Sequence, residues 1–327
     1  VVPGLPAAPF AVLAAIAIAA ALLAARARPR PAATLDEPGA DAVRGPRLQL
    51  ALGDKLAPRA SELHAALAEL RAEVTRRAGV PIPPLAIARD AALGDTEAAL
   101  AIDGTQVAWL ALGNGDPIGA LRDKLPGALA LVVPDLLGID RVAALVERAA
   151  ARAPVVVREV VPRIVPLPVL AELLRELARE QVPLDDLPAI LEALALAPTA
   201  APLSARDLPA AIDHLRGQLR RQISARWAPR GQLAVYTVDA MIEDAVRGAI
   251  DRRDGGAVLA LEPAIAQDII AAVRGKLGRG PAVLLVSGDV RRHLRDLLEA
   301  ELPDVAILAA HELSPGTAVT TAGRIEV

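Results

Sequence analysis

Two prolines interrupt one helical pattern in the middle of the chain. The leucines before them recur at the spacing of a single helix face: Leu170, Leu173, Leu174 and Leu177. Pro183 lacks the amide hydrogen that a continuing helix needs, so the helix must end before it. Pro188 suits the first turn of a second helix, and Asp185 or Asp186 can cap that helix. The sequence therefore predicts two short helices that meet at an angle.

The charge of this segment argues against DNA binding, although two helices joined by a turn are a common DNA-binding arrangement. Between Leu170 and Ala195 there are two arginines and six acidic residues, a net charge of −4. Phosphate groups would repel such a surface. The net charge of the whole chain is −3, which also differs from the basic surface of a general nucleic-acid binder. We expect no nucleic-acid partner.

The apolar N-terminus predicts a membrane-spanning helix. Residues 1–25 contain no charged residue, and Arg26, Arg28 and Arg30 follow them. About 20 apolar residues cross the core of a bilayer, so we expect one transmembrane helix in residues 1–27. Arginines after the apolar run indicate a cytoplasmic flank, not a signal peptide. An alanine-rich buried helix is the alternative. Because the first residue is valine, we expect this sequence to be part of a longer chain.

Four further segments follow, and together they predict a multidomain α+β chain. Residues 28–46 are rich in proline, alanine, glycine and charge, which is typical of a linker. Residues 47–160 predict a first α+β subdomain. In it we expect a strand at 48–52, a helix at 59–78, further strands with a tight turn at Asp103 and Gly104, and a helix at 138–151.

Residues 161–228 predict a helical subdomain that ends in one helix from Ser204 to Arg226. Residues 229–327 predict an α/β subdomain, which begins with a strand at 232–239 and a helix to about residue 251. The strands "AVLALE", "AVLLVS" and "VAILAA" then alternate with two helices. That βαβαβ order predicts a parallel sheet with right-handed crossovers.

The residues that carry enzyme chemistry show no convincing grouping. The chain contains no cysteine, and its four histidines lack the spacing of metal ligands. The stretch "RGKLGRGP" lacks the order of a phosphate-binding loop, and Ser287 lacks the G-x-S-x-G context of a nucleophile. We therefore expect no catalytic, cofactor or metal site and no enzyme. A ligand pocket at the carboxyl ends of the C-terminal strands, near Ser287 to Asp289, would instead favour a small-ligand or nucleotide-binding enzyme.

Several long stretches, in order, resemble the large export-gate protein of flagellar and virulence type III secretion systems (the FlhA/SctV family). They are "PGLPAAPF", "VVPRIVPLPVLAELLRELAREQVPLDDLPAILEALA", "RRQISARWAPRGQLAVYTVD", "SGDVRRHLRDLLEAELPDVAILAAHELSPG" and the closing "GRIEV". The resemblance implies a non-enzymatic export subunit in the bacterial inner membrane. It also implies that the cytoplasmic part forms a nine-membered ring, beside other membrane proteins of the export apparatus. Chaperone–substrate complexes and the ATPase stalk would dock on that ring.

The resemblance also implies candidate contact residues in two places. Asp116 and Pro117 match the family's docking segment for chaperones. The split helix matches the subdomain that makes ring contacts, and its alternating charges are candidate interface residues: Glu172, Arg175, Glu176 and Arg179.

Two departures from the family pattern leave a second hypothesis open. The family's proton-conducting membrane region is not in this sequence. The stretch "GNGDPIGALRDKLPG" lacks the phenylalanine that lines the docking groove in the family, and the second subdomain is reduced. An apolar anchor of that kind dominates interface energetics. The alternative is therefore a divergent paralogue that keeps the ring scaffold without chaperone docking.

Overall fold

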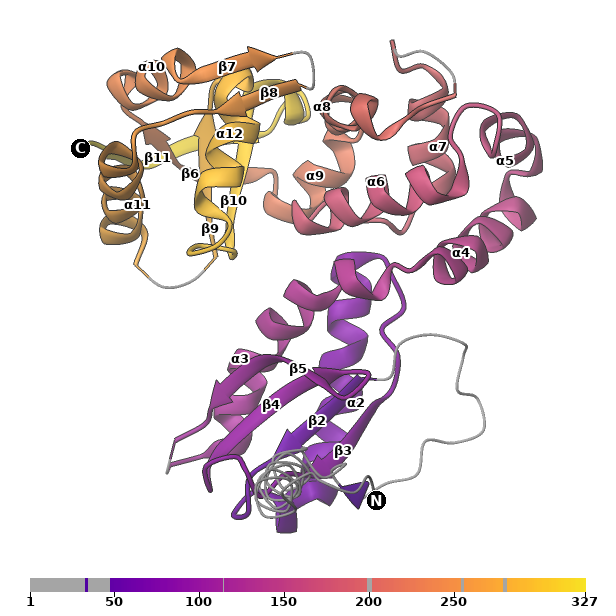
Figure 1. Cartoon of the computed structure of the whole chain (residues 1–327), viewed down its shortest axis with the longest axis vertical. Coiled ribbons are helices and arrows are strands. Elements are labelled where there is room, and N and C mark those ends of the chain that lie inside the picture. The colour runs from indigo at the N-terminus through magenta and orange to yellow at the C-terminus, as the bar shows by residue number, and fades with distance from the viewer. Residues whose placement is uncertain (1–32, 35–47, 114, 199–201, 254–255, 279–280) are drawn as a thin grey trace, which may run out of the picture.

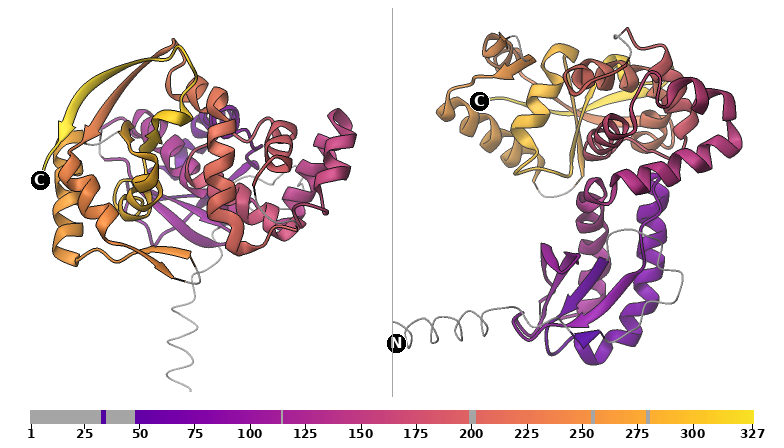
Figure 2. Two further views of the ribbon diagram at one scale, coloured as in Figure 1. Left: turned by 90° about the horizontal axis from the view of Figure 1, so that it is seen from above. Right: turned by 45° about the vertical axis from the view of Figure 1, so that its right-hand side comes forward.

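The computed structural model describes residues 33–34, 48–113, 115–198, 202–253, 256–278 and 281–327. They form three units: a first unit (residues 48–136), a helical unit (residues 139–227) and a C-terminal unit (residues 232–327). The helical and C-terminal units lie side by side above the first unit (Figures 1 and 2). The predicted transmembrane helix at residues 1–27 lies outside the described residues. Within the described ranges, no helix is both long and apolar enough to span a membrane.

The first unit is a five-stranded sheet with two helices on one face. Its elements are β2 (Leu48–Leu52), α2 (Ala60–Ala78), β3 (Leu85–Arg89), β4 (Glu97–Ile102), β5 (Thr105–Ala111) and α3 (Pro117–Val132). The strand order is β1-β3-β2-β4-β5, with β2 and β3 parallel and the other pairs antiparallel. β1 (Ala33–Thr34) belongs to the segment predicted as a linker.

Sequence alternation explains this two-layer arrangement. Leu48, Leu50 and Leu52 are buried on the face covered by the helices, whereas Gln49 between them is half-buried. The turn predicted between β4 and β5 is confirmed, because Asp103 and Gly104 both have positive φ, at 50° and 82°. Two such residues fit the twist of a tight hairpin.

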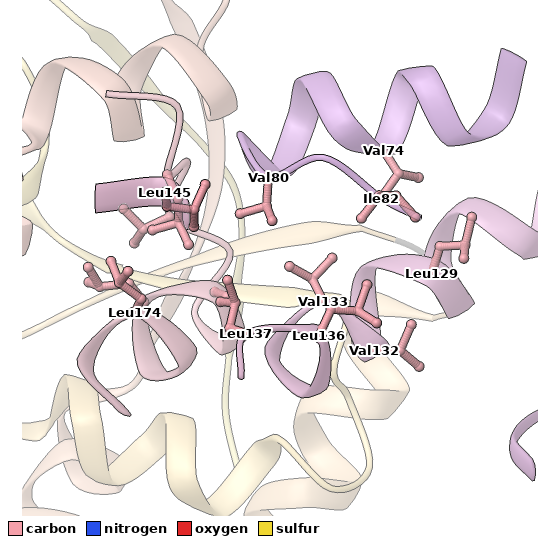
Figure 3. Close-up of a cluster of buried hydrophobic side chains, with 14 of the residues drawn as sticks. Val74, Val80, Ile82, Leu129, Val132, Val133, Leu136, Leu137, Leu145 and Leu174 are labelled. Atoms are coloured by element: carbon pink, nitrogen blue, oxygen red, sulfur yellow. The ribbon is translucent and has the colours of Figure 1, made fainter. Parts of the chain in front are cut away.

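The helical unit packs directly against the first unit. It contains α4 (Ile139–Arg152), α5 (Pro154–Val160), α6 (Leu167–Arg179), α7 (Leu187–Ala195), α8 (Leu208–Gln218) and α9 (Arg220–Trp227). The helix predicted from Ser204 to Arg226 is wrong in one respect: it breaks at Leu219 into α8 and α9. Figure 3 shows the shared core, in which Val80 and Val133 of the first unit and Leu145 and Leu174 of the helical unit lie in one cluster around Leu137.

The C-terminal unit has a four-stranded parallel sheet. It comprises β6 (Gln232–Val238), α10 (Ala240–Gly248), β7 (Ile250–Arg253), β8 (Gly256–Leu259), α11 (Pro263–Leu277), β9 (Ala282–Val286), α12 (Gly288–Leu298), β10 (Val305–Ala309) and β11 (Ala318–Ile325). The order is β10-β9-β6-β11. One face of the sheet contributes Leu284 and Ile307 to a core with α10, α11 and α12. The other face contributes Val283 and Leu308 to the core of the helical unit.

Two predictions for this unit are wrong. The strand "AVLALE" was expected in the parallel sheet, but it is β8, which pairs antiparallel with β7 as a separate two-stranded sheet. β6 takes its place in the βαβαβ order. The helix expected to reach residue 251 ends at Gly248, because Ile250–Arg253 form β7. A short apolar run does not reveal which partner it will pair with.

Candidate functional site: the junction between helices α6 and α7

The α6–α7 turn, residues Glu180–Asp186, is where all three units meet. The two short helices predicted from the sequence are confirmed. α6 ends in a hydrogen-bonded cap, in which the amides of Gln181 and Val182 donate to the carbonyls of Ala178 and Leu177 at 2.9 Å. The amide of Ala189 donates to the Asp186 carboxylate at 3.4 Å, so Asp186 caps α7.

Gln181 connects this turn to two other elements. Its φ is 57°, in the left-handed region where glycine is the usual residue. A glycine would lack its side-chain contacts. The side-chain nitrogen Nε2 of Gln181 donates to the carbonyl of Pro303 at 3.2 Å, and the side-chain oxygen Oε1 accepts from Arg226 Nη2 at 2.9 Å. The turn is thereby tied to α9 and to the C-terminal unit.

The end of α2 closes against the same turn. The amide of Leu184 donates to the carbonyl of Ala78 at 3.0 Å. Gly79 has a φ of 71°, and a Cβ at that position would stand 2.1 Å from the amide nitrogen of Asp185. Only glycine fits this backbone approach, so residue 79 fixes how closely the first unit meets the turn.

A buried ionic cluster joins the turn to α8 and α12. It consists of Arg216, Arg291, Glu180, Glu312 and Asp213. Arg216 and Arg291 are each 1% exposed and Glu312 is 0% exposed. Arg216 donates two hydrogen bonds of 2.7 Å to the Glu312 carboxylate and lies 2.6 Å from Glu180.

Arg291 completes the cluster from α12. It donates to Glu180 at 2.6 Å and to Asp213 at 2.8 Å, and its Nε lies 3.1 Å from Glu312. Every guanidinium nitrogen of Arg216 and Arg291 therefore has a protein partner. The arrangement is suited to holding two units together rather than to binding a ligand, because a buried ion pair is stable only when its remaining donors are also satisfied.

The pKa shifts in the cluster have physical causes that can be named. Burial alone would raise the pKa of the Glu312 carboxyl, but hydrogen bonds and charge from Arg216 and the charge of Arg291 outweigh it, so that pKa is lowered. Burial would lower the pKa of Arg291, but Glu180, Glu312 and Asp213 raise it. Both shifts stabilise the charged forms.

Sequence reasoning missed this cluster, although a signal was present. Arg216 follows Ile212 by four residues, and Arg291 precedes Leu294 by three, so both arginines stand on the apolar stripe of an amphipathic helix. A charge at such a position requires a buried counter-charge. The sequence did not show which carboxylates supply it, because Glu312 lies 96 residues from Arg216.

The four predicted ring residues all lie on α6, but they differ in exposure and in the partners they already have. Glu172 and Arg179 are exposed. Arg175 donates through Nε to the carbonyl of Leu137 at 2.9 Å, and Glu176 pairs with Arg179 one turn away. Burial raises the pKa of Glu176. Glu172 thus forms no ion pair with any residue that the structure describes. The interface role of all four residues stays a prediction.

The predicted docking residues Asp116 and Pro117 start α3, far along the sequence from this junction. The Asp116 carboxylate accepts from the amide of Ile118 at 3.1 Å, and Pro117 occupies the first turn of the helix. Both are features of a helix N-terminus. Their structural role is therefore accounted for, and the docking role stays a prediction.

Side chains of two other elements contact the carboxyl end of β9, where the sequence left a ligand pocket open. A Cβ on Gly288 would stand 3.0 Å from the His311 ring, so this ring lies directly on the start of α12. The amide of Ser287 donates to Glu243 at 2.9 Å. Ser287 and Gly288, where a pocket would have favoured a ligand-binding enzyme, are thus in contact with Glu243 and His311. The described residues also contain no group of three or more potential metal ligands.

Comparison with known proteins agrees with the fold. Residues 114–318 match the FHIPEP family. The low calcium response locus protein D of Yersinia pestis is 29% identical over 197 residues, which cover 58% of this chain and 27% of that protein. The flagellar biosynthesis protein FlhA of Bacillus subtilis is 27% identical over 218 residues, 65% of this chain and 32% of FlhA. The chain therefore spans about a third or less of the length of these relatives.

Solved structures extend the likeness to nearly the whole described chain. The CdsV protein of Chlamydia pneumoniae has a TM-score of 0.73 at 22% identity, covering 89% of this chain and all of that one. The nonameric EPEC SctV-C has a TM-score of 0.67 at 17% identity, again over 89% of this chain. These values show a shared fold. Since the family match covers more than half of the sequence, the chain belongs to the FHIPEP family.

Proposed function

We propose that this protein is a non-enzymatic subunit of a protein-export gate of the type III secretion or flagellar kind, with its described part forming a cytoplasmic ring. The observation that carries the proposal is the FHIPEP match across residues 114–318, together with a fold like that of cytosolic domains that are nonameric. Function resides in sites rather than in folds, so the proposal needs a surface that can make a ring.

The helical unit would make the contact between neighbouring copies in the ring. Glu172 and Arg179 are exposed on α6, and a head-to-tail contact that repeats through a fixed rotation closes a ring. Residues 1–27 would anchor each copy in the bacterial inner membrane, beside the other membrane proteins of the export apparatus. Tethering to one membrane raises the local concentration of copies and favours assembly.

Substrate reception depends on the segment between β5 and α3. β5 ends at Ala111 and α3 begins at Pro117, and five intervening residues are too few to form a further subdomain. This observation favours a second candidate function: a divergent paralogue that keeps the ring scaffold without chaperone docking. In either case the ATPase stalk remains a proposed partner, because the family fold includes CdsV, which has been solved in complex with CdsO.

Light scattering of the whole chain in mild detergent, measured across protein concentration, tests the ring. We expect a species whose protein mass is a fixed multiple of the chain, near ninefold, and ring-shaped particles by electron microscopy. A monomer at every concentration, also after reconstitution into lipid discs, would contradict the proposal. Adding export chaperone–substrate complexes to the assembled ring then separates the two candidates, since only the full gate retains them.

A further inference from the structure

The sheet of the first unit ends in an edge strand, β5, that is open to further pairing. The strand order places β4 on one side of β5 and no described strand on the other. The seven residues Thr105–Ala111 include neither a charged residue nor a proline, although charges, prolines and bulges are the usual protection of such edges. The one irregularity in the β4–β5 register lies between Leu100 and Ala101, so Ala108–Ala111 keep a regular register.

Trp109 lies within this regular stretch and is largely exposed to solvent. Its side chain is 65% exposed, in a chain of which aromatic residues make up only 1%. Leu110 is buried on the face that the helices cover, so the alternation of the strand places Trp109 on the opposite face, together with the exposed Val107. Exposed tryptophans of this kind are the side chains that most often anchor protein interfaces.

Only small side chains neighbour Trp109 across the strands of this face. Its partner in β4 is Ala99, whose own partner in β2 is Ala51. Neither alanine is large enough to cover an indole ring. A further strand along the open edge of β5 would bring its side chains within about 5.5 Å of Trp109 and could cover the ring.

We propose that β5 binds an extended segment of a partner polypeptide, which adds a sixth strand to the sheet and packs an apolar side chain on Trp109. An extended chain is the occupant that an open edge requires, because its backbone donates and accepts hydrogen bonds at the spacing of the free β5 groups. The lack of charge on β5 favours an uncharged, apolar segment.

A second copy of this chain fits the edge less well than a different polypeptide. Two β5 strands that pair with each other would be related by a twofold axis, whereas a closed ring is built from head-to-tail contacts. This exclusion rests on the proposed ring. The addition of a strand to β5 does not depend on it.

Peptide binding to the whole chain in mild detergent tests the addition of a strand. The probe is a synthetic peptide that copies β4 (Glu97–Ile102), the strand with which β5 already pairs, with lysines and a fluorophore at its ends. The control peptide has the same sequence with every backbone amide N-methylated, which removes the donors that strand pairing needs. Fluorescence anisotropy gives the dissociation constant. We expect saturable binding of the probe and none of the control peptide.

Two substitutions with matched controls locate the binding site. Trp109→Ala should weaken binding by at least about tenfold, because it removes the aromatic anchor. Val107→Lys should also weaken it, because a charge on an edge strand opposes pairing. The controls Leu131→Ala and Leu131→Lys change a residue of α3 that is 48% exposed, and they should bind like the wild type. Circular dichroism checks that each variant is folded.

Tryptophan fluorescence gives an independent readout of the same contact. The chain has two tryptophans, so a Trp227→Phe background leaves Trp109 as the only emitter. Its emission should move to shorter wavelength as the peptide covers the ring. The same shift without peptide, growing with protein concentration, would identify a second copy as the occupant and overturn the inference.

The remaining outcomes separate this inference from the proposed ring. Equal binding of the two peptides, or wild-type affinity in Trp109→Ala, would refute strand addition at β5. Light scattering of the same samples reports assembly. A chain that assembles but binds no probe refutes strand addition alone, whereas a monomer that binds the probe through Trp109 supports strand addition and refutes the ring.

Discussion

Neutralising Glu312 provides the sharpest test of how the helical and C-terminal units are held together. In Glu312→Gln the side chain keeps its size but loses its charge, while Arg216 and Arg291 remain buried at 1% exposure. Two guanidinium groups then depend on Glu180 and Asp213, and the Asp213 side chain is 47% exposed. Removing one partner of a buried ion pair costs about 3–5 kcal/mol, because an uncompensated charge stays in the interior.

Urea denaturation followed by circular dichroism measures this loss. We expect Glu312→Gln to lower the free energy of unfolding by about 3–5 kcal/mol. The matched control is Glu172→Gln on α6, an exposed carboxylate without an ion pair in the described part of the chain, and it should stay within about 0.5 kcal/mol of the wild type. A loss below about 1 kcal/mol for Glu312→Gln would show that the cluster does not hold the two units together.

Comparing the wild type with Glu312→Gln across pH gives a second test. The direction of the change in stability follows from the shift in the pKa of Glu312. The pKa of Glu312 is lowered from its ordinary 4.5, so its contribution to stability is complete above about pH 4.5. That contribution is lost as the pH falls through the lower, folded-state pKa. The stability difference between wild type and Glu312→Gln should therefore shrink in acid. A difference that stays constant down to pH 3 would refute the assigned shift.

Three further substitutions test the elements around the junction. Gln181→Gly should destabilise the protein by about 1 kcal/mol, because two hydrogen bonds of about 1 kcal/mol each are lost while about 1 kcal/mol of backbone strain is relieved; a net gain in urea midpoint would contradict the bridging role. Gly79→Ala should cost more than about 2 kcal/mol, since its Cβ meets the Asp185 backbone at 2.1 Å. Its control, Gly138→Ala, faces open space at a φ of −68° and should change thermal stability little. Asp116→Ala should lose about 1 kcal/mol with the cap of α3, whereas Asp116→Asn should retain it. If both Asp116 variants melt alike, the carboxylate is not acting as a cap.

Local sequence was sufficient for most secondary structure. The break between α6 and α7 could be predicted because Pro183 and Pro188 constrain the backbone wherever they stand. The β4–β5 turn could be predicted because Asp103 and Gly104 accept positive φ. These constraints act over a few residues, so no knowledge of the remaining fold is needed. Periodicity likewise predicted α2 and β2, and it predicted α11, β9, α12 and β10 in their order.

Which strands pair and which charged residues meet was decided only by the tertiary structure. The β8 strand has the composition of a buried parallel strand, yet it pairs with β7, because the neighbouring position in the sheet is filled by β6. The ionic cluster depends in the same way on distant partners: Arg216 stands on an apolar stripe, but Glu312 becomes its counter-charge only when η4 (Ala310–Glu312) packs on α8. The sequence determined most of the helices and strands, since those choices are largely local, but it did not predict the break at Leu219 or the end of α10 at Gly248. The fold decided which charges are buried together and which remain on the surface, since that depends on contacts between residues about 100 positions apart.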